Sequence, residues 1–398
     1  MTGTRLHYAL GLHMHQPPGN LKALMGSSPQ EAEQIIRCYE RPARYAQEYS
    51  DFGYLHLGFS GILLEQLLDS SVVDAYRHIV DIPAMLGRYR EAKNIELVGM
   101  GYYHPIFPLI PKVDWEDQLT SGRIIMERAF GRAPRGFWPP EMAFCMEMIP
   151  ALVKIGYEYV VVDGVHVRPQ DGLNDIYRPY LACHDGVCIT VVPRDRDLSN
   201  AQERGLDPDW FAAESWRRVQ GSPRPGELRL VTSWSDGENT SWFRRTREEE
   251  GFFGRFFAPF MENARADALA VIPVTLSAHL EKNPPRTHAR VQTGSWNPGS
   301  TGGYEFSRWA GSESQQEAAR AIQDLSRRYW DIRRRQAGLD EEGRRALARA
   351  RALILESQTS CFLFWGDAWI PHLYKRTVPA DRDLAFAEEE LRLLREDG

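Results

Sequence analysis

The sequence predicts an α/β protein whose parallel strands form a closed or nearly closed barrel, followed by a helical region. Short apolar, β-rich runs recur about seven times, helix-like segments lie between several of them, and the pattern becomes helical from about Ser312. Strands that alternate with helices form parallel sheets with right-handed crossovers. The runs are apolar almost throughout, which is typical of strands buried on both faces.

The predicted strands are short, and a count of seven favours a barrel over an open sheet. Helices are predicted over residues 60–79 and 146–157, where apolar residues recur at spacings of three and four. The predicted strands cover residues 6–13, 54–60, 95–100, 135–140, 157–163, 187–193 and 228–234.

The chain is expected to divide into two domains. Residues 1–311 contain all the predicted strands, and residues 312–398 are predicted to form a helical domain packed against the barrel. In this second domain a Gly-Leu-Asp break at 338–340 is followed by a helix that Asp340 and Glu341 start. Residues 381–396 are predicted to form a further amphipathic helix.

The composition is that of a soluble globular protein. The chain has 398 residues, 43% of them hydrophobic, and a net charge of −6. This balance argues against a nucleic-acid or acidic-membrane partner, because binding phosphate requires a basic face. No apolar stretch reaches the ~20 residues that span a bilayer, and the N-terminus lacks a signal-peptide pattern. We therefore expect a cytoplasmic protein, and its oligomeric state stays open.

The cysteines indicate a reduced compartment rather than a disulfide framework. There are five, an odd number, and they are scattered along the chain. The segment CHDGVC (183–188) contains two cysteines and a histidine, but a zinc site would need a further ligand at fitting spacing. A turn between two strands is the favoured interpretation of this segment.

Polar, aromatic, glycine and proline residues gather directly after five of the predicted strands. Barrel active sites are built from the loops at the carboxyl ends of the strands, so the sequence predicts a functional site at this end. The five segments are HMHQPPGN (13–20), GYYHPIFPLIP (101–111), EMAF (141–144), RDRDLSN (194–200) and SDGENTSW (235–242).

The stretch GFWPPEMAF (136–144) places the carboxylate of Glu141 close behind Trp138 and two prolines. Sugar rings stack on aromatic side chains, and glycosidic bonds are broken by pairs of carboxylates, so the stretch is typical of a carbohydrate site. Taken alone, Glu141 also fits the first turn of a helix after two prolines, and Asp236-Gly237 fits a simple turn.

The ordered set of motifs resembles glycoside hydrolase family 57, whose members act on α-glucans as hydrolases and transferases. The resemblance covers nearly the whole chain and implies a (β/α)7-type incomplete TIM barrel followed by a C-terminal helical domain. It also implies a retaining, double-displacement mechanism that needs no metal or cofactor. The motifs are GLHMHQPPGN, ELVGMGYYHPIFPLIP, GFWPPEMAF, LVTSWSDGENTSWF and ESQTSCFLFWGDAW, with LLEQL, RDRDLSN and GSWNPG in support.

By this resemblance Glu141 is the catalytic nucleophile and Asp236 the general acid/base. Such carboxylates lie roughly 5–5.5 Å apart on opposite sides of the scissile bond. Asp236 would need a pKa raised by burial and by the charge of Glu141. Glu238 is the rival acid in the same motif. The implied substrates are α-1,4 glucans, with α-1,6 linkages also considered, in maltodextrin, starch or glycogen.

Further residues are expected to bind the sugar. His13 and His15 point the same way on a strand, and the resemblance puts them with Gln16 beside the scissile sugar. Arg194 and Asp195 form either a rim ion pair or sugar contacts. For each tryptophan, core packing is an equally good interpretation. The expected substrate-binding residues are His13, His15, Gln16, His104, Trp138, Trp234, Glu238, Trp296 and Trp365.

The chain departs from the family pattern in the fifth motif. Many members carry an acid beside aromatics there, whereas this chain has Thr359, Ser360 and Cys361. This leaves product specificity, and the choice between hydrolysis and transfer, open. Two alternatives follow. One is a glucan-binding barrel without catalysis. The other is a metal-dependent sugar deacetylase or mannosidase-like enzyme that uses His13, His15 and an acid such as Asp163.

Overall fold

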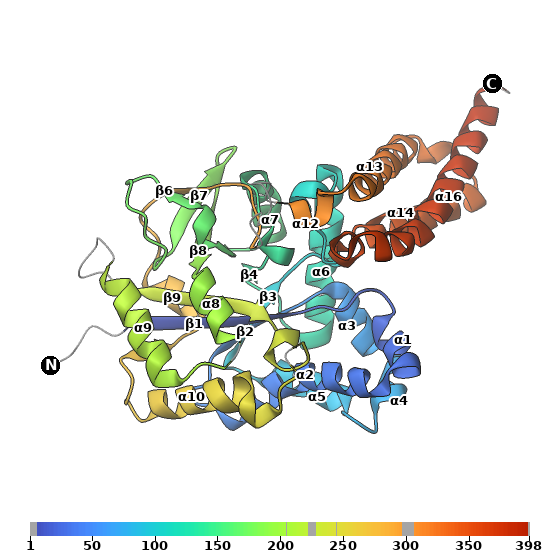
Figure 1. Cartoon of the computed structure of the whole chain (residues 1–398). Coiled ribbons are helices and arrows are strands. Elements are labelled where there is room, and N and C mark those ends of the chain that lie inside the picture. The colour runs from blue at the N-terminus through green and yellow to red at the C-terminus, as the bar shows by residue number, and fades with distance from the viewer. Residues whose placement is uncertain (1–5, 204, 222–227, 244, 297–305, 397–398) are drawn as a thin grey trace.

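The computed structural model (Figure 1) describes residues 6–203, 205–221, 228–243, 245–296 and 306–396. All seven predicted strands are present, and all run parallel around a barrel. From β1 to β8 each barrel strand pairs with the next one in chain order, and β9, the last of them, pairs with β1. The barrel strands are β1 (Leu6–Met14), β2 (Leu55–Phe59), β3 (Ile95–Gly99), β4 (Gly136–Phe137), β5 (Tyr159–Asp163), β8 (Val187–Arg194) and β9 (Leu230–Asp236).

The barrel closes between β8 and β9 without a regular ladder. The backbone N–H of Asp195 donates to the carbonyl of Thr232 over 2.8 Å, and the Nε of Arg194 donates to the carbonyl of Trp234 over 2.9 Å. The predicted incomplete seven-stranded barrel is therefore confirmed, and its irregular junction lies between β8 and β9.

Helices follow most of the barrel strands and cover the outside of the barrel (Figure 1). The predicted helix over residues 60–79 is two helices, because the Asp69 carboxylate accepts the N–H of Ser71 and caps a new start. The helices are α1 (Asn20–Ser27), α2 (Pro29–Glu48), α3 (Gly61–Leu68), α4 (Ser70–Tyr76), α5 (Ile82–Glu91), α6 (Trp115–Phe130), α7 (Ile149–Ile155), α8 (Arg196–Gln202), α9 (Pro208–Gln220), α10 (Ala258–Arg265) and α11 (Leu276–Lys282).

Four short strands were not predicted. β10 (Val271–Pro273) extends the sheet beside the start of β1, and β6 (Val167–Pro169) pairs with β11 (Ala289–Val291). The connection from β5 to β8 holds no α-helix. It contains β6 and β7 (Tyr180–His184), and β7 lies antiparallel to β8. Runs of three to five residues are too short for a periodicity to reveal them.

The segment CHDGVC forms a hairpin turn between β7 and β8, as expected. Asp185 and Gly186 both have positive φ, as the tightest hairpin turns require. The expectation of fully reduced cysteines is wrong here, because Cys183 and Cys188 form a disulfide. The register places them directly opposite each other, with their Cα atoms 4.1 Å apart. Cys38, Cys145 and Cys361 are free thiols.

The C-terminal region is helical, as predicted. Ser312 caps its first long helix through a reciprocal pair of bonds with Gln315, and Asp340 caps the next helix. The last helix is longer than the predicted 381–396, because it begins at Ile370 and continues through Pro379. The helices are α12 (Ser307–Ala310), α13 (Glu313–Arg333), α14 (Glu341–Ser357), α15 (Ser360–Phe364) and α16 (Ile370–Glu396).

The helical region is joined to the barrel by a shared apolar core and a buried polar contact. Ile106 and Ala143 of the barrel pack into one cluster with Trp309, Ile322 and Phe362. Beside this cluster, a fully buried carboxylate at the start of α6 accepts four hydrogen bonds from the helical region. The acceptor is Asp114, and the donors are Ser326, Trp330, Arg351 and Gln358.

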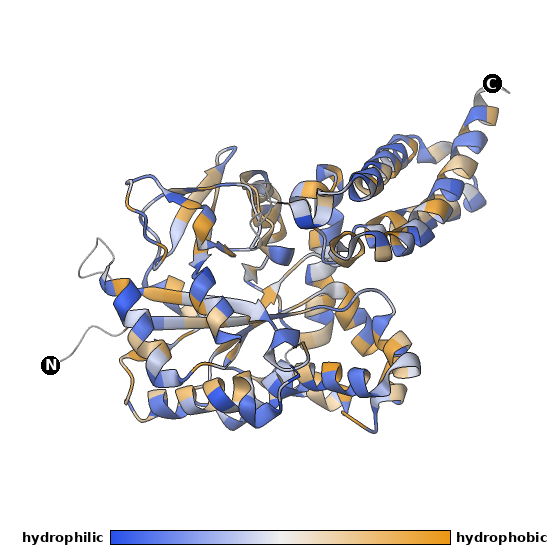
Figure 2. Ribbon diagram, viewed as in Figure 1, coloured by the Kyte–Doolittle hydropathy of each residue, from blue (hydrophilic) through white to orange (hydrophobic). Residues whose placement is uncertain are grey.

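Hydrophobic residues concentrate on the barrel strands, and the surrounding helices carry hydrophobic and hydrophilic residues together (Figure 2). None of the described helices has both the length and the apolar composition needed to cross a membrane.

Candidate active site

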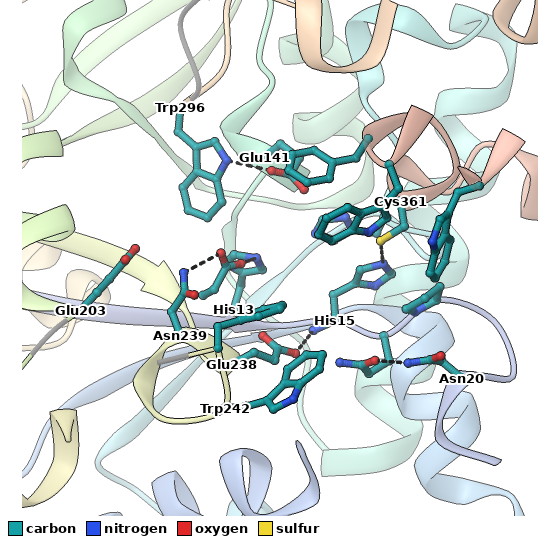
Figure 3. A pocket seen from close by; sticks show the side chains of 18 of the residues that line it. His13, His15, Asn20, Glu141, Glu203, Glu238, Asn239, Trp242, Trp296 and Cys361 are labelled. Carbon is teal, nitrogen blue, oxygen red and sulfur yellow. Dashed lines mark hydrogen bonds and ion pairs between the residues drawn. The ribbon is translucent and has the colours of Figure 1, made fainter. Parts of the chain in front are cut away.

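A pocket of about 890 Å³ lies at the carboxyl mouth of the barrel. It collects residues from β1, β8 and β9, from the loops after β3 and β4, and from the C-terminal helices (Figure 3). Nine of the eleven predicted site residues line it: His13, His15, Gln16, His104, Glu141, Asp236, Glu238, Trp296 and Trp365.

Glu141 sits in an unusual turn after β4. It and Met142 both adopt left-handed backbone conformations, with φ of 56° and 50°. Consecutive non-glycine residues rarely do so, and each costs about 1–3 kcal/mol unless the surroundings enforce it. The turn is a three-residue 3-10 segment (Pro140–Met142), so Glu141 does not begin an α-helix. The strained turn instead directs its carboxylate into the pocket.

The Glu141 carboxylate accepts a hydrogen bond from Nε1 of Trp296 over 2.8 Å (Figure 3). Burial raises the pKa of Glu141, and the negative charge of Asp236 raises it further, to about 7. This electrostatic coupling means that the two predicted catalytic carboxylates share one environment.

Asp236 ends β9 and faces His13 on the neighbouring strand. The His13 Nε2 lies 2.5 Å from one carboxylate oxygen, and the side-chain amide of Asn239 donates to the other over 3.1 Å. Burial disfavours the charged form of His13, but the charge of Asp236 outweighs it and raises the His13 pKa. His13 is therefore the charged partner of Asp236.

Glu238, the rival acid, is engaged elsewhere. Its Oε1 accepts the backbone N–H of His15 over 3.1 Å and the Tyr39 hydroxyl over 2.6 Å. Burial, together with the charge of Asp236, raises its pKa to about 7. These bonds hold Glu238 at the pocket wall.

Three histidines of the pocket wall stack with one another and with the buried ring of Trp138. Ring centroids are 3.9 Å apart for Trp138 and His13, 5.8 Å for His13 and His104, and 4.0 Å for His104 and His15. Burial and the charge of His13 lower the His15 pKa to about 3, and burial also lowers the His104 pKa well below its usual value. Both rings are consequently neutral.

The departure in the fifth motif completes this wall. The Ser360 hydroxyl lies 2.8 Å from Nδ1 of His104. The Cys361 thiol lies 3.4 Å from Nε2 of His15 (Figure 3). The helical region therefore contributes directly to the pocket, with uncharged groups at this place.

Two predicted stacking residues do not line the pocket. Trp138 and Trp234 are fully buried in the barrel core, so neither offers an open face to a sugar. Trp234 fills the space beside Gly11, where a Cβ atom would lie 2.2 Å from the indole ring. Both side chains pack in the barrel core, whereas Trp365 is 50% exposed at the pocket mouth.

Other aromatic residues at the mouth were not predicted as binding residues. Trp242 and Phe243 stack with centroids 4.2 Å apart directly after the Asp236 motif, and Phe364 and Trp369 flank Trp365. The feature of the sequence that could have indicated them is their position next to the recognised motifs. Sequence does not show which aromatic residues of a motif face solvent.

Arg194 and Asp195 do not pair with each other. Arg194 pairs with the buried Asp163, which also accepts a hydrogen bond from Arg196. Asp195 caps α8 instead. Asp163, the acid considered for a metal, is thus neutralised by two arginines. Among the described residues no group of three or more His, Cys, Asp or Glu side chains is arranged to hold a metal ion.

A parallel barrel with acids, histidines and exposed indole rings at its carboxyl mouth has the architecture of a barrel glycosidase. The model of the family described as glycosyl hydrolase family 57 matches residues 9–292, and this chain belongs to that family.

Relatives in this family have been named for α-glucan chemistry. The chain is 27% identical to alpha-amylase 1 of Dictyoglomus thermophilum, over 82% of this chain and 44% of that protein. It is 26% identical to the 4-alpha-glucanotransferase of Thermococcus litoralis, over 77% of this chain and 42% of that protein. The chain thus spans less than half the length of these two relatives.

The fold also matches a solved structure over almost its full length. The family 57 branching enzyme of Thermococcus kodakaraensis superimposes with a TM-score of 0.74 and 17% identity. The match covers 98% of this chain and 92% of that one.

Proposed function

We propose that the protein is a retaining enzyme that cleaves α-glucans, with Glu141 as nucleophile and Asp236 as general acid/base. The observation that carries the proposal is that these two acids enter one aromatic-walled pocket from the ends of two separate barrel strands, β4 and β9. The substrate class is α-1,4 glucan, with α-1,6 linkages also considered. The names of the amylase and glucanotransferase relatives support this class.

The first half of the reaction uses both acids. The ionised Glu141 attacks the anomeric carbon, while the proton held between His13 and Asp236 passes through Asp236 to the leaving glycosidic oxygen. A glycosyl ester on Glu141 results, and the remainder of the glucan leaves as an alcohol. His13 and Asn239 hold Asp236 in position for this transfer.

The second half reverses the roles. Asp236, now ionised, removes a proton from water or from a sugar hydroxyl, which attacks the anomeric carbon and releases Glu141. Water gives hydrolysis and a sugar acceptor gives transfer. The exposed Trp365 and Phe243 lie where an extended glucan would stack on leaving the pocket.

The test compares wild type with Glu141→Gln and Asp236→Asn on a series of maltooligosaccharides, resolving product lengths. We expect wild type to be active and each variant to lose about 10²–10⁴-fold or more. With α-maltosyl fluoride as substrate, Asp236→Asn should show a burst of fluoride release, because fluoride leaves without a proton, whereas the second half of the reaction stays slow without its general base. Undiminished turnover in either variant would refute the assignment of that residue.

One observation favours a second candidate, glucan binding without turnover. Cys361 stands where many members of the family carry an acid. Binding in a glycan pull-down, with unchanged polymer length and no wild-type turnover, would support it. The length ladder from the first experiment separates this candidate from hydrolysis and from transfer.

A further inference from the structure

The short segment Gly294–Trp296, after β11, is bonded along the turn that carries Glu141. Phe144 and Gly294 exchange both backbone hydrogen bonds, over 3.0 and 3.2 Å. The Trp296 N–H donates to the Glu141 carbonyl over 3.0 Å, and its indole donates to the Glu141 carboxylate over 2.8 Å. Segments about 150 residues apart in sequence thus form one strand-like contact.

The other side of the segment is held by the barrel mouth. A ring nitrogen of His166 lies 2.8 Å from the Ser295 carbonyl. Gly294 is buried against the same ring, where a Cβ atom would lie 2.4 Å from the imidazole. Any other residue at 294 would push the segment away from His166 and from the Glu141 turn.

The Trp296 indole is itself fixed in place. The guanidinium of Arg194 lies over its ring, 5.2 Å from the centroid. Arg194 is 2% exposed and is held by Asp163, by the carbonyl of Trp234 and by Asn200. Asp163, Arg194, Trp296 and Glu141 therefore form a chain of contacts from the barrel core to the pocket.

We infer that Trp296 is a positioning residue that holds the Glu141 carboxylate in its attacking orientation, and that the Gly294–Trp296 segment enforces the strained turn beneath it. The inference deepens the proposed function and rests on it. Two consecutive left-handed residues persist only when their surroundings over-determine them. This segment supplies one backbone hydrogen bond to the turn, two to Phe144 shortly after it, and one to the Glu141 carboxylate.

The charge on Glu141 gives a readout that does not depend on turnover. Burial and the charge of Asp236 raise its pKa, whereas the charge of His13 and the Trp296 hydrogen bond lower it. The Cys361 thiol also interacts with it electrostatically. The hydrogen bond donated by the indole N–H stabilises the ionised carboxylate more than the neutral acid. Loss of this bond therefore disfavours the ionised form and raises the Glu141 pKa.

The experiment replaces the indole donor while preserving its shape. Trp296→benzothienylalanine has sulfur in place of the N–H group, and Trp296→Phe removes the donor by ordinary mutagenesis. In both variants we expect the Glu141 pKa, measured by carboxyl ¹³C NMR against Glu141→Gln, to rise by about one unit. With a maltooligosaccharide substrate kcat should fall about 10–100-fold, while KM changes less than about threefold.

Gly294→Ala tests the segment independently and should reproduce the loss of kcat, because the added methyl group displaces Trp296. Gly87→Ala, at a helix position with open space around it, is its control. Trp210→Phe is the control for loss of an indole, because Trp210 is 49% exposed and lies outside the pocket. We expect both controls to leave the Glu141 pKa and kcat unchanged.

A Glu141 pKa within about 0.3 unit of wild type in the benzothienylalanine variant would overturn the inference. An equal loss of kcat in Trp210→Phe would overturn it too, because the effect would then not be specific to the indole in the pocket. Absence of glucan turnover in wild type would refute the proposed function but not the inference about Trp296. The NMR measurement of the Glu141 pKa would still decide whether Trp296 holds the carboxylate.

Discussion

At the residue scale, the pocket contains titratable groups whose charged forms are destabilised by burial. Glu141 and Glu238 have raised pKa values because both are removed from water and both feel the charge of Asp236. His13 counters that charge from a distance of 2.5 Å. The pocket therefore holds protons at neutral pH that the same groups would release in solution.

This charge arrangement predicts the acidic side of the activity profile. A nucleophile must be ionised, and the Glu141 pKa is about 7. We therefore expect kcat/KM to fall about tenfold for each pH unit below about 7. Initial rates on a maltooligosaccharide between pH 4 and pH 9 test this. A plateau that extends to pH 5 would show that Glu141 is not the nucleophile or is not protonated at neutral pH.

The same group predicts a pH-dependent gain in stability for Glu141→Gln. The pKa of Glu141 is about 7 in the folded protein, against about 4.3 in an unfolded chain. Between these values the folded state keeps a proton that the unfolded state loses. The stabilising contribution is therefore complete below about pH 4.3 and is lost as the pH rises through about 7.

At pH 8 the wild type bears the cost of a buried charge that glutamine does not have. We expect the unfolding free energy of Glu141→Gln to exceed that of wild type by about 1–3 kcal/mol at pH 8, and by much less at pH 4. Urea unfolding at the two pH values measures this. An equal difference at both pH values would contradict the assigned charge.

At the element scale, the pocket depends on two segments that the barrel does not supply. Gly294–Trp296 lies along the Glu141 turn, and α15 places Ser360 and Cys361 against His104 and His15. Both segments are held at the pocket by contacts with residues far away in the sequence. The positions of their side chains therefore depend on those contacts.

For α15 the anchor is Asp114, which accepts a hydrogen bond from Gln358 just before that helix. Asp114→Asn replaces one accepting oxygen by a donor and leaves the buried Arg351 underpaired. We expect a loss of about 2–4 kcal/mol in unfolding free energy, with a lower kcat/KM because the α15 wall loosens.

Asp383→Asn is the matched control. Asp383 pairs with Arg349 on the surface of the helical region, where such a pair contributes less than about 1 kcal/mol. Chemical denaturation and glucan kinetics of the two variants decide the matter. Equal stability changes in both would show that Asp114 is not a special anchor.

At the scale of the whole molecule, the barrel and the helical region share one apolar cluster and one pocket. The proposed boundary at residue 311 cuts that cluster, which contains Ile106 and Ala143 on one side and Ile322 and Phe362 on the other. The same cut removes Cys361, Phe364, Trp365 and Trp369 from the pocket mouth. The two parts are thus structurally dependent.

We expect the fragment 1–311 to melt at least about 10 °C below the full chain, or to lose cooperative unfolding. The apolar surface it exposes is the reason, because each buried aliphatic or aromatic side chain contributes about 1.5–3 kcal/mol. Differential scanning calorimetry of the fragment and the full chain measures this. A fragment with the melting temperature of the full chain would identify residues 1–311 as an independent domain.

Much of this architecture follows from local patterns in the sequence. Strands buried on both faces give continuous apolar runs, and these runs predicted all seven barrel strands. The polar residues that follow the strands predicted the end of the barrel at which Glu141 and Asp236 lie. Helix starts at Ser312 and Asp340 follow from the side-chain oxygens that cap them. β10 and β7 escaped prediction because three to five residues carry too little periodicity.

The sequence by itself determined the barrel, its functional end and the residue types that the pocket gathers, because these depend on short-range periodicity and on strand direction. Only the tertiary structure decided which tryptophans are core and which face the pocket. It alone paired Cys183 with Cys188 and brought Trp296 to Glu141 and Cys361 to His15. Those contacts join residues from separate elements, and their geometry follows from how the whole chain packs.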